Sequence, residues 1–230
     1  MKILTFTKDK SSLKYYLLAA LSVAAVYSCK LMDLFIPLFD NIYYGNLVAV
    51  FLNISSMLLW IAEFLIMFFV CKKLKIQIFS TEKKPQLKLS RLIVLFVLAI
   101  LPMFIVSAYL NFTVKVVYDF GFKVTILGFW DNATRLIAWA ARIVFMLLFI
   151  HFMHIAIEKN FKFNKAALNK YFPWGGIFSI LIFGIIDFFF FSTSLAWFYL
   201  FLTFYYDIIY MLSDRKFLST YFICYLIWLL

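Results

Sequence analysis

Charged residues are scarce in this sequence: 14% are Asp, Glu, Lys or Arg, whereas 66% are hydrophobic and 22% are aromatic. Soluble domains carry about 25% charged residues, so this composition excludes a soluble domain of the same length. With 230 residues, the chain is also too short for a membrane bundle plus a separate folded domain. We therefore predict an all-α integral membrane protein, a single polytopic domain surrounded by the lipid bilayer.

Motifs for catalysis, metal binding and nucleic-acid binding are absent from the sequence. No HExxH, GxSxG or glycine-rich phosphate loop occurs, so we do not expect an enzyme. Cys29, Cys71 and Cys224 are odd in number and lack metal-ligand spacing, so we expect no disulfide framework, no bound metal and no cofactor. The net charge of +11 does not indicate nucleic-acid binding, because no basic patch with interleaved aromatic residues accompanies it.

Apolar runs near the length needed to cross a bilayer, about 20 residues, recur along the chain. We predict spans at 15–36, 47–70, 92–110, 136–157, 174–191 and 195–212, with 111–134 as an outer loop and the first span left uncleaved. Residues 217–230 are short for a span. A seventh span, a re-entrant segment and a helix lying at the interface are therefore all open for them.

The positive charges are distributed unevenly between the two sets of loops. The N-terminal arm and every second loop hold 17 of the 22 Lys and Arg residues, whereas the other loops hold two. Because positive charge favours the cytoplasmic side, this asymmetry predicts a cytoplasmic N-terminus and a multi-pass protein of the inner membrane. Frequent Phe, Ile, Lys, Asn and Tyr are typical of an AT-rich gene and indicate a bacterial source.

The fourth predicted span is unusual because it contains ionisable residues at membrane depth. Arg142, His151 and His154 lie within it, and these two histidines are the only ones in the chain. Charge inside a membrane is costly, so such residues normally face the interior of a bundle and are functional candidates. Counting 1.5 Å per residue from the span ends gives two polar layers.

The outer layer pairs Arg142 with Asp187, which we interpret as a buried ion pair that fixes packing. The inner layer contains Glu63, His151 and Asp207, with His154 slightly lower. Two interpretations of the inner layer are open. Neighbouring acids and histidines influence each other's protonation and so could form a proton or cation path, or they could simply hold helices together.

Two further features point to contacts with other molecules. Ala20 and Ala24 are one turn apart, a spacing that permits close helix contact. This spacing is similar to an alanine motif in the first helix of the solute-binding subunits of energy-coupling-factor transporters, which also have six spans. The resemblance covers one helix and implies a helix-contact surface. A basic loop with Lys72, Lys73, Lys75, Lys83 and Lys84 is a candidate docking surface on the cytoplasmic side.

These observations predict a non-enzymatic inner-membrane subunit that assembles with itself and with a cytoplasmic partner through its basic loops. Such a subunit would be the sensor or anchor of an immunity, defence or signalling complex. The alternative is a transport component for a small solute or ion, either a substrate-binding membrane subunit or a proton-coupled carrier, that uses the inner polar layer.

Overall fold

The computed structural model describes residues 4–6, 9–33, 45–78, 90–91, 93–95, 97, 100, 126–163, 172–190 and 193–229. Most of the predicted span 92–110 lies outside these residues, as do Lys83 and Lys84. The side chain of Asp187 also lies outside the described part of the chain.

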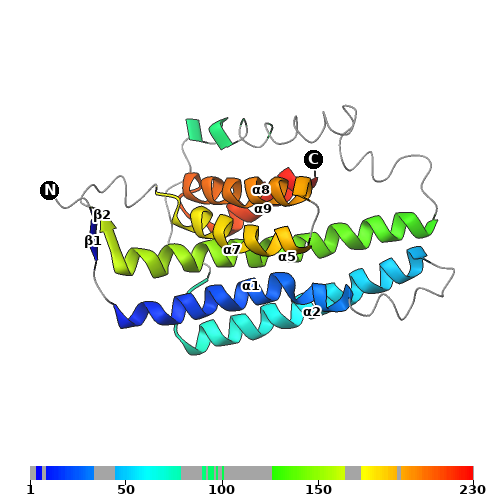
Figure 1. Ribbon diagram of the computed structural model, residues 1–230, viewed down its shortest axis with the longest axis horizontal. Coiled ribbons are helices and arrows are strands. Elements are labelled where there is room, and N and C mark those ends of the chain that lie inside the picture. The colour runs from blue at the N-terminus through cyan, green and yellow to red at the C-terminus, as the bar shows by residue number, and fades with distance from the viewer. Residues whose placement is uncertain are drawn as a thin grey trace. The chain divides into compact units, whose positions relative to one another are not determined.

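Nearly all of the described chain is helical (Figure 1). The elements are β1 (Leu4–Phe6), the 3-10 turn η1 (Lys10–Ser12), α1 (Leu13–Asp33), α2 (Gly45–Lys73), α5 (Ile126–Asn160), β2 (Phe161–Phe163), α7 (Trp174–Phe190), α8 (Thr193–Leu212) and α9 (Phe217–Leu229). Two stretches, Val50–Lys73 and Gly128–Asn160, are long and apolar enough to cross a membrane. Helices α7, α8 and α9 contain shorter apolar stretches.

The predicted spans 174–191 and 195–212 and the open segment 217–230 form helices α7, α8 and α9, with ends that agree to within two residues, but none of the three is among the stretches long and apolar enough to cross a membrane. The predicted outer loop over 111–134 is wrong at its end, because α5 begins at Ile126. Its polar residues do not interrupt the helix, since their side chains find partners there. The Thr134 hydroxyl donates to the Trp130 carbonyl one turn earlier, and Asp131 accepts from the Asn53 amide.

The chain forms two compact units, each of which is described by itself. The first unit contains Met1–Val23, Ile78–Leu87 and Met146–Thr220, and the second contains Ala24–Gln77, Lys88–Phe145 and Tyr221–Leu230. Helices α1, α5 and α9 each contribute residues to both units.

In the first unit, α7 and α8 lie side by side (Figure 1). Gly184 of α7 lies against Leu200 of α8 so closely that a Cβ atom there would overlap the leucine side chain. The rings of Phe149 and Phe183, in edge-to-face contact with centroids 5.0 Å apart, join α5 to α7. These contacts place the last turns of α5 next to the paired helices α7 and α8.

The N-terminal arm is attached to the end of α5 by backbone and side-chain hydrogen bonds. Strand β1 pairs antiparallel with β2, which directly follows α5. The Asp9 amide donates to Asn160 Oδ1 over 3.0 Å, and Asn160 Nδ2 donates to the Ser12 hydroxyl over 2.9 Å. Hydrogen bonds from the hydroxyl and amide of Ser11 hold the pKa of the Asp9 carboxyl below its ordinary value.

Two helices end in residues with left-handed backbone. Lys75, with φ of 54°, ends α2, and the Ile76 amide donates back to the Cys71 carbonyl. Asp214 and Arg215, with φ of 52° and 59°, form the turn between α8 and α9. Non-glycine residues adopt this conformation at some cost in free energy, so the surrounding contacts must hold the turn in place.

In the second unit, a polar stripe of Asn53, Trp60 and Glu63 on α2 faces α1 and α5. The Trp60 indole donates to the Ala25 carbonyl over 2.7 Å, and the Ser28 hydroxyl lies 3.1 Å from Glu63 Oε2. Further along α2, the Asn53 amide donates to Asp131 of α5 over 2.9 Å. The stripe therefore satisfies its own polar groups through helix–helix contacts.

Helix α9 packs on α5 in the second unit through stacked rings. Trp228 stacks on Trp139 with centroids 5.0 Å apart, and Tyr225 continues the stack at 6.4 Å from Trp228. The Trp139 ring also contacts Arg142, whose guanidinium carbon lies 4.4 Å from the ring centroid. This is cation–π geometry, and it gives the buried arginine an aromatic neighbour.

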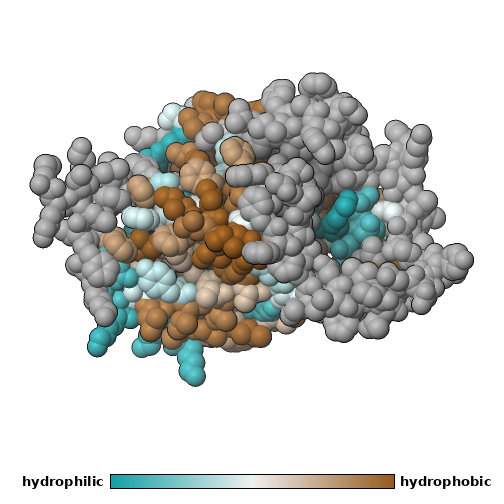
Figure 2. All heavy atoms as spheres, in the orientation of Figure 1, coloured by the Kyte–Doolittle hydropathy of each residue, from teal (hydrophilic) through white to brown (hydrophobic). Residues whose placement is uncertain are grey.

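Apolar side chains are also exposed on the outer faces of the helices. Figure 2 shows hydrophobic residues over much of the described surface in view. On α2 they include Phe51, Leu58 and Phe69, each more than half exposed. Exposure of so many large apolar side chains suits contact with lipid or with other proteins.

Candidate functional site

Polar side chains from α5, α8 and the following turn meet the first turn of α7 inside the first unit. On α5, His151, His154 and Glu158 are three, four and seven residues apart and share one helix face. We refer to His154, Glu158, Asp207 and Arg215 as the His154 cluster.

His154 and Asp207 form the centre of the cluster, and both are fully buried. Nε2 of His154 lies 2.6 Å from Oδ1 of Asp207, a short hydrogen-bond distance typical of a charge-assisted pair. The other carboxylate oxygen, Oδ2, accepts a hydrogen bond of 2.6 Å from the Gly176 amide. Asp207 thus links α5 and α7 to α8 through one carboxylate.

The Asp207 carboxylate also suits the start of α7 electrostatically. The first N–H groups of a helix lack partners within the helix and carry a partial positive charge, so a carboxylate there is favourable. The helix begins directly after Pro173, which fits the start of a helix because it has no N–H to satisfy.

Gly175 and Gly176 permit the close approach of the three helices. A Cβ atom on Gly175 would lie 2.8 Å from Ile150 Cγ2 and 3.0 Å from His154 Cδ2. On Gly176 it would lie 3.0 Å from Asp207 Oδ2, the acceptor of its own amide. A side chain at either position would therefore require Ile150 or Phe204, and the Asp207 carboxylate, to shift.

The Gly175 amide lies 3.4 Å from His154 Nε2, which is also the nitrogen nearest Asp207. A nitrogen that carries the proton toward Asp207 cannot accept another one. The 2.6 Å contact with the carboxylate is much the stronger, so we assign the proton at Nε2 to that bond.

Glu158 and Arg215 form the outer part of the cluster. The guanidinium is paired with the carboxylate through two bonds, from Nη2 to Oε1 and, over 2.8 Å, from Nη1 to Oε2. Burial alone acts to lower the pKa of Arg215, but the bonds to Glu158 outweigh it and the pKa is raised. Arg215 therefore stays charged and ties the strained α8–α9 turn to α5.

His154 lies between two carboxylates. Its Nδ1 atom is buried without a hydrogen-bond partner among the described residues, and the nearest carboxylate oxygen, Glu158 Oε1, is 3.9 Å away. With a neutral imidazole the cluster has two negative charges and one positive, whereas with an imidazolium the charges balance. A single proton at His154 thus changes the charge of a buried site from about −1 to zero.

His151 does not join the cluster directly. Its Nδ1 atom lies 2.6 Å from the Tyr210 hydroxyl, and the Tyr210 ring lies between the two histidines, with its centroid 5.8 Å from that of His154. Of the predicted inner layer, the structure thus brings His154 together with Asp207. Glu63 belongs to the second unit and is bonded to Ser28.

The predicted ion pair of Arg142 with Asp187 lies outside what the structure describes, because the Asp187 side chain is not described. Arg142 is 6% exposed and lies over the Trp139 ring. The described lysines of the basic loop, Lys72, Lys73 and Lys75, are exposed at the end of α2. Ala20 and Ala24 are also exposed, on α1.

Within the described residues, no group of three or more His, Cys, Asp or Glu side chains is arranged to hold a metal ion. A scan against protein-family models, a search of curated proteins and a search of solved structures each found no match. The site consists of buried groups that are able to share and exchange a proton.

Sequence reasoning missed the glycine pair, Tyr210 and Arg215 as parts of this site. One signal for the glycines is present, since Gly175-Gly176 at the start of an apolar helix combines free amides with the absence of side chains. For Arg215 no such signal exists, because a basic residue in a short turn is equally typical of a topology signal.

Proposed function

We propose that this chain is a multi-pass, non-enzymatic membrane protein that acts as a proton-responsive sensor subunit. The observation that carries the proposal is the position of His154, fully buried between Asp207 at 2.6 Å and Glu158 at 3.9 Å. Histidine is the side chain whose ordinary titration falls between pH 5 and 8, so it is suited to report physiological pH.

The contacts of the cluster support a route from His154 to the α8–α9 turn. A second proton on the imidazole occupies Nδ1, and the nearest acceptor is Glu158 Oε1. Movement of the Glu158 carboxylate toward this N–H weakens its bonds to Arg215, which hold the turn. Because Asp214 and Arg215 both have left-handed backbone, the turn should loosen when the ion pair weakens.

A cytoplasmic partner remains part of the proposal. The exposed lysines at the end of α2, Lys72, Lys73 and Lys75, support docking of an acidic surface through charge complementarity. We expect the affinity for such a partner, or for a second copy of the chain, to change when the α8–α9 turn loosens.

Hydrogen exchange of residues 213–216 in phosphatidylcholine nanodiscs tests the proposal. After correction for the intrinsic pH dependence of exchange, we expect faster exchange of this turn at pH 5 than at pH 8. His154→Gln should abolish the difference, and Glu158→Gln should give fast exchange at both pH values. His151→Gln, which removes the only other histidine, is the matched control and should retain the difference. A turn that exchanges equally at both pH values in the unmodified protein would contradict the proposal.

The second candidate is a transport component, a proton-coupled carrier or a substrate-binding membrane subunit. It is favoured by the row of exchangeable groups from His151 and Tyr210 through His154 to Glu158, which extends over about 10 Å of α5. A carrier should move protons across proteoliposomes, and Asp207→Asn should stop it. Purification in mild detergent separates the candidates further, because a sensor should co-elute with a stoichiometric protein and a carrier with a small molecule.

A further inference from the structure

The His154 cluster lies close to one end of the first unit. At a rise of 1.5 Å per residue, His154 is about 9 Å before Asn160, the last residue of α5. The N-terminal arm is attached at that end, where β1 pairs with β2. The start of the same helix, at Ile126, is much further from the cluster. The two ends of α5 therefore offer protons very different distances to His154.

Ionisable groups approach His154 from α5, from α8 and from the turn that follows α8. Within the described residues they are Asp207 and Tyr210 of α8, Arg215 of the turn, Glu158 of α5, and His151 beyond the Tyr210 ring. Helix α7 contributes backbone amides instead. Asp207 and Tyr210 are buried, so neither meets solvent directly.

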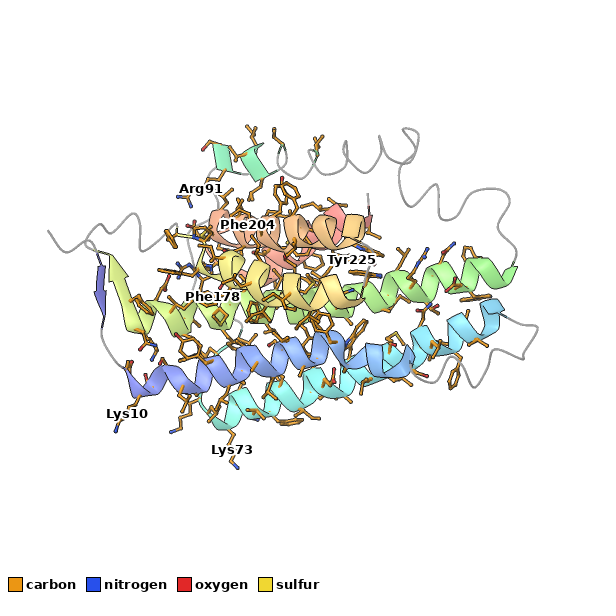
Figure 3. The ribbon with its side chains drawn as sticks, viewed as in Figure 1. Lys10, Lys73, Arg91, Phe178, Phe204 and Tyr225 are labelled. Carbon is orange, nitrogen blue, oxygen red and sulfur yellow. The ribbon has the colours of Figure 1, made fainter. Side chains whose placement is uncertain are left out.

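Glu158 links this buried site to the surface. Its side chain is 28% exposed whereas that of His154 is 0% exposed, and its Oε1 atom lies 3.9 Å from the imidazole Nδ1. Rotation of the carboxylate or one bridging water molecule can close this gap. Lys159 and Asp9, at the same end, are 33% and 40% exposed, and Lys10 points away from the ribbon (Figure 3). Because these neighbours are charged, their surroundings are water or lipid headgroups rather than hydrocarbon.

The opposite side of the cluster is closed by apolar side chains. Phe149 of α5 meets Phe183 of α7, and Leu200 of α8 packs against α7. All three are buried, and none of them can carry a proton. Between this layer and the cluster, the hydroxyls of Ser179 and Thr203 donate to carbonyls of their own helices. The groups that can bind a proton therefore lead from His154 toward the end of α5.

We propose that protons reach His154 from the end of the first unit at which α5 ends, and that Glu158 transfers them. A hydronium ion outside gives its proton to the Glu158 carboxylate, and the resulting carboxylic acid gives it to Nδ1 of His154, which restores the carboxylate. The inference deepens the proposed function and rests on it for the response of His154 to protons. With the cytoplasmic N-terminus that the loop charges favour, the chain responds to the pH of the cytoplasm.

Solid-state NMR of ¹⁵N-labelled histidine in liposomes tests the direction of access. In the His151→Gln chain, His154 gives the only histidine signal. Liposomes captured through a histidine-free tag on the N-terminal arm have this end of the protein outside, and impermeant buffers hold pH 5 on one side and pH 8 on the other. We expect acid outside to convert the signal to that of an imidazolium, and acid inside to leave a neutral imidazole.

Two matched variants test whether Glu158 transfers the proton. Glu158→Gln and Arg215→Gln both remove the ion pair that holds the α8–α9 turn, but the first alone removes the carboxylate. NMR relaxation at the titration midpoint measures the rate of exchange between imidazole and imidazolium. This rate should be about 100-fold lower in Glu158→Gln than in Arg215→Gln, and Glu158→Asp should restore most of it. Asp9→Asn, which neutralises an exposed carboxylate at the same end, is the control and should keep the original rate.

Three results would overturn the proposal, with circular dichroism establishing that each variant is folded. One is a His154 signal that follows the pH inside the captured liposomes or follows both sides equally. Another is the same exchange rate in Glu158→Gln and Arg215→Gln. The third is a His154 that titrates in the unmodified chain but not in His151→Gln, which would assign proton entry to His151. A turn that ignores pH while His154 titrates from outside would contradict only the proposed sensor function.

Discussion

Removal of both partners of the His154–Asp207 couple should destabilise the protein by clearly less than the sum of the two single removals. His154→Ala leaves the Asp207 carboxylate fully buried with the Gly176 amide as its one remaining partner among the described residues. Asp207→Ala leaves His154 beside Glu158 without its hydrogen-bond partner and leaves the Gly176 amide unsatisfied. Stranding a buried charged group such as the Asp207 carboxylate by removing its partner costs about 3–5 kcal/mol.

The double variant should lose less stability than the two single variants lose together. With both side chains gone, no charge is left stranded at the couple, and what remains is a cavity and one unsatisfied amide. We therefore expect the free energy of unfolding of the double variant to exceed the additive expectation by about 2 kcal/mol or more. Residues in contact typically show coupling energies of about 0.5–3 kcal/mol.

Equilibrium unfolding in mixed micelles, followed by circular dichroism, measures the four free energies of the cycle. The pair His151 and Tyr210 is the control cycle, since their 2.6 Å hydrogen bond involves no carboxylate and His151 is only partly buried. Its coupling should be near 1 kcal/mol. Additivity at His154 and Asp207 within about 0.5 kcal/mol would show that the two side chains do not depend on each other, and the cluster would then lose its centre.

Further expectations concern the helix ends and the topology. Gly176→Ala should destabilise the protein by about 1–3 kcal/mol in the same unfolding assay, because its Cβ atom would lie 2.7 Å from Phe204 Cδ2 and 3.0 Å from the carboxylate that the amide binds. Lys75→Gly should stabilise it by up to about 1 kcal/mol by relieving the left-handed backbone, and a loss of stability would contradict this. The lowered pKa of Asp9 means that its stabilising contacts are complete above about pH 4 and are lost as the pH falls through the folded-state pKa. Protease resistance of the N-terminal arm should therefore decrease only below about pH 4, and Asp9→Asn should remove this dependence. A reporter fused after Lys84 should read cytoplasmic and one fused near Lys123 external, and the reverse result would refute the charge-based topology.

Helix positions could be predicted from the sequence because apolar runs and turn residues are local signals. Pro173 followed by an apolar stretch predicts the start of α7, and the charged turn after residue 212 predicts the end of α8. The same rule failed at 126–134, where polar residues suggested a loop. Their side chains are satisfied by neighbours on the helix and by Asn53, which lies 78 residues from Asp131 along the chain.

The arrangement of the site could not be predicted from the same signals. Depth counting placed His151, Asp207 and Glu63 in one layer because it uses only distance along a span. It does not give the rotation of each helix about its axis, which determines that His154 faces Asp207 while His151 faces Tyr210. That rotation is set by packing, including the close approach that Gly175 and Gly176 allow between α7 and its neighbours.

The composition of the cluster is itself an argument for a role beyond packing. Three helices can be held together by apolar side chains at lower cost, because burying charged groups requires that each be paired and hydrogen-bonded. Here a carboxylate, an imidazole, a second carboxylate and a guanidinium lie in sequence, and the last of them ends in the strained turn between α8 and α9. Each member of this arrangement is charged or can bind a proton, and the one histidine among them, His154, lies in the middle. Packing alone requires neither that order nor a histidine at that position, whereas both fit the proposed response to protons.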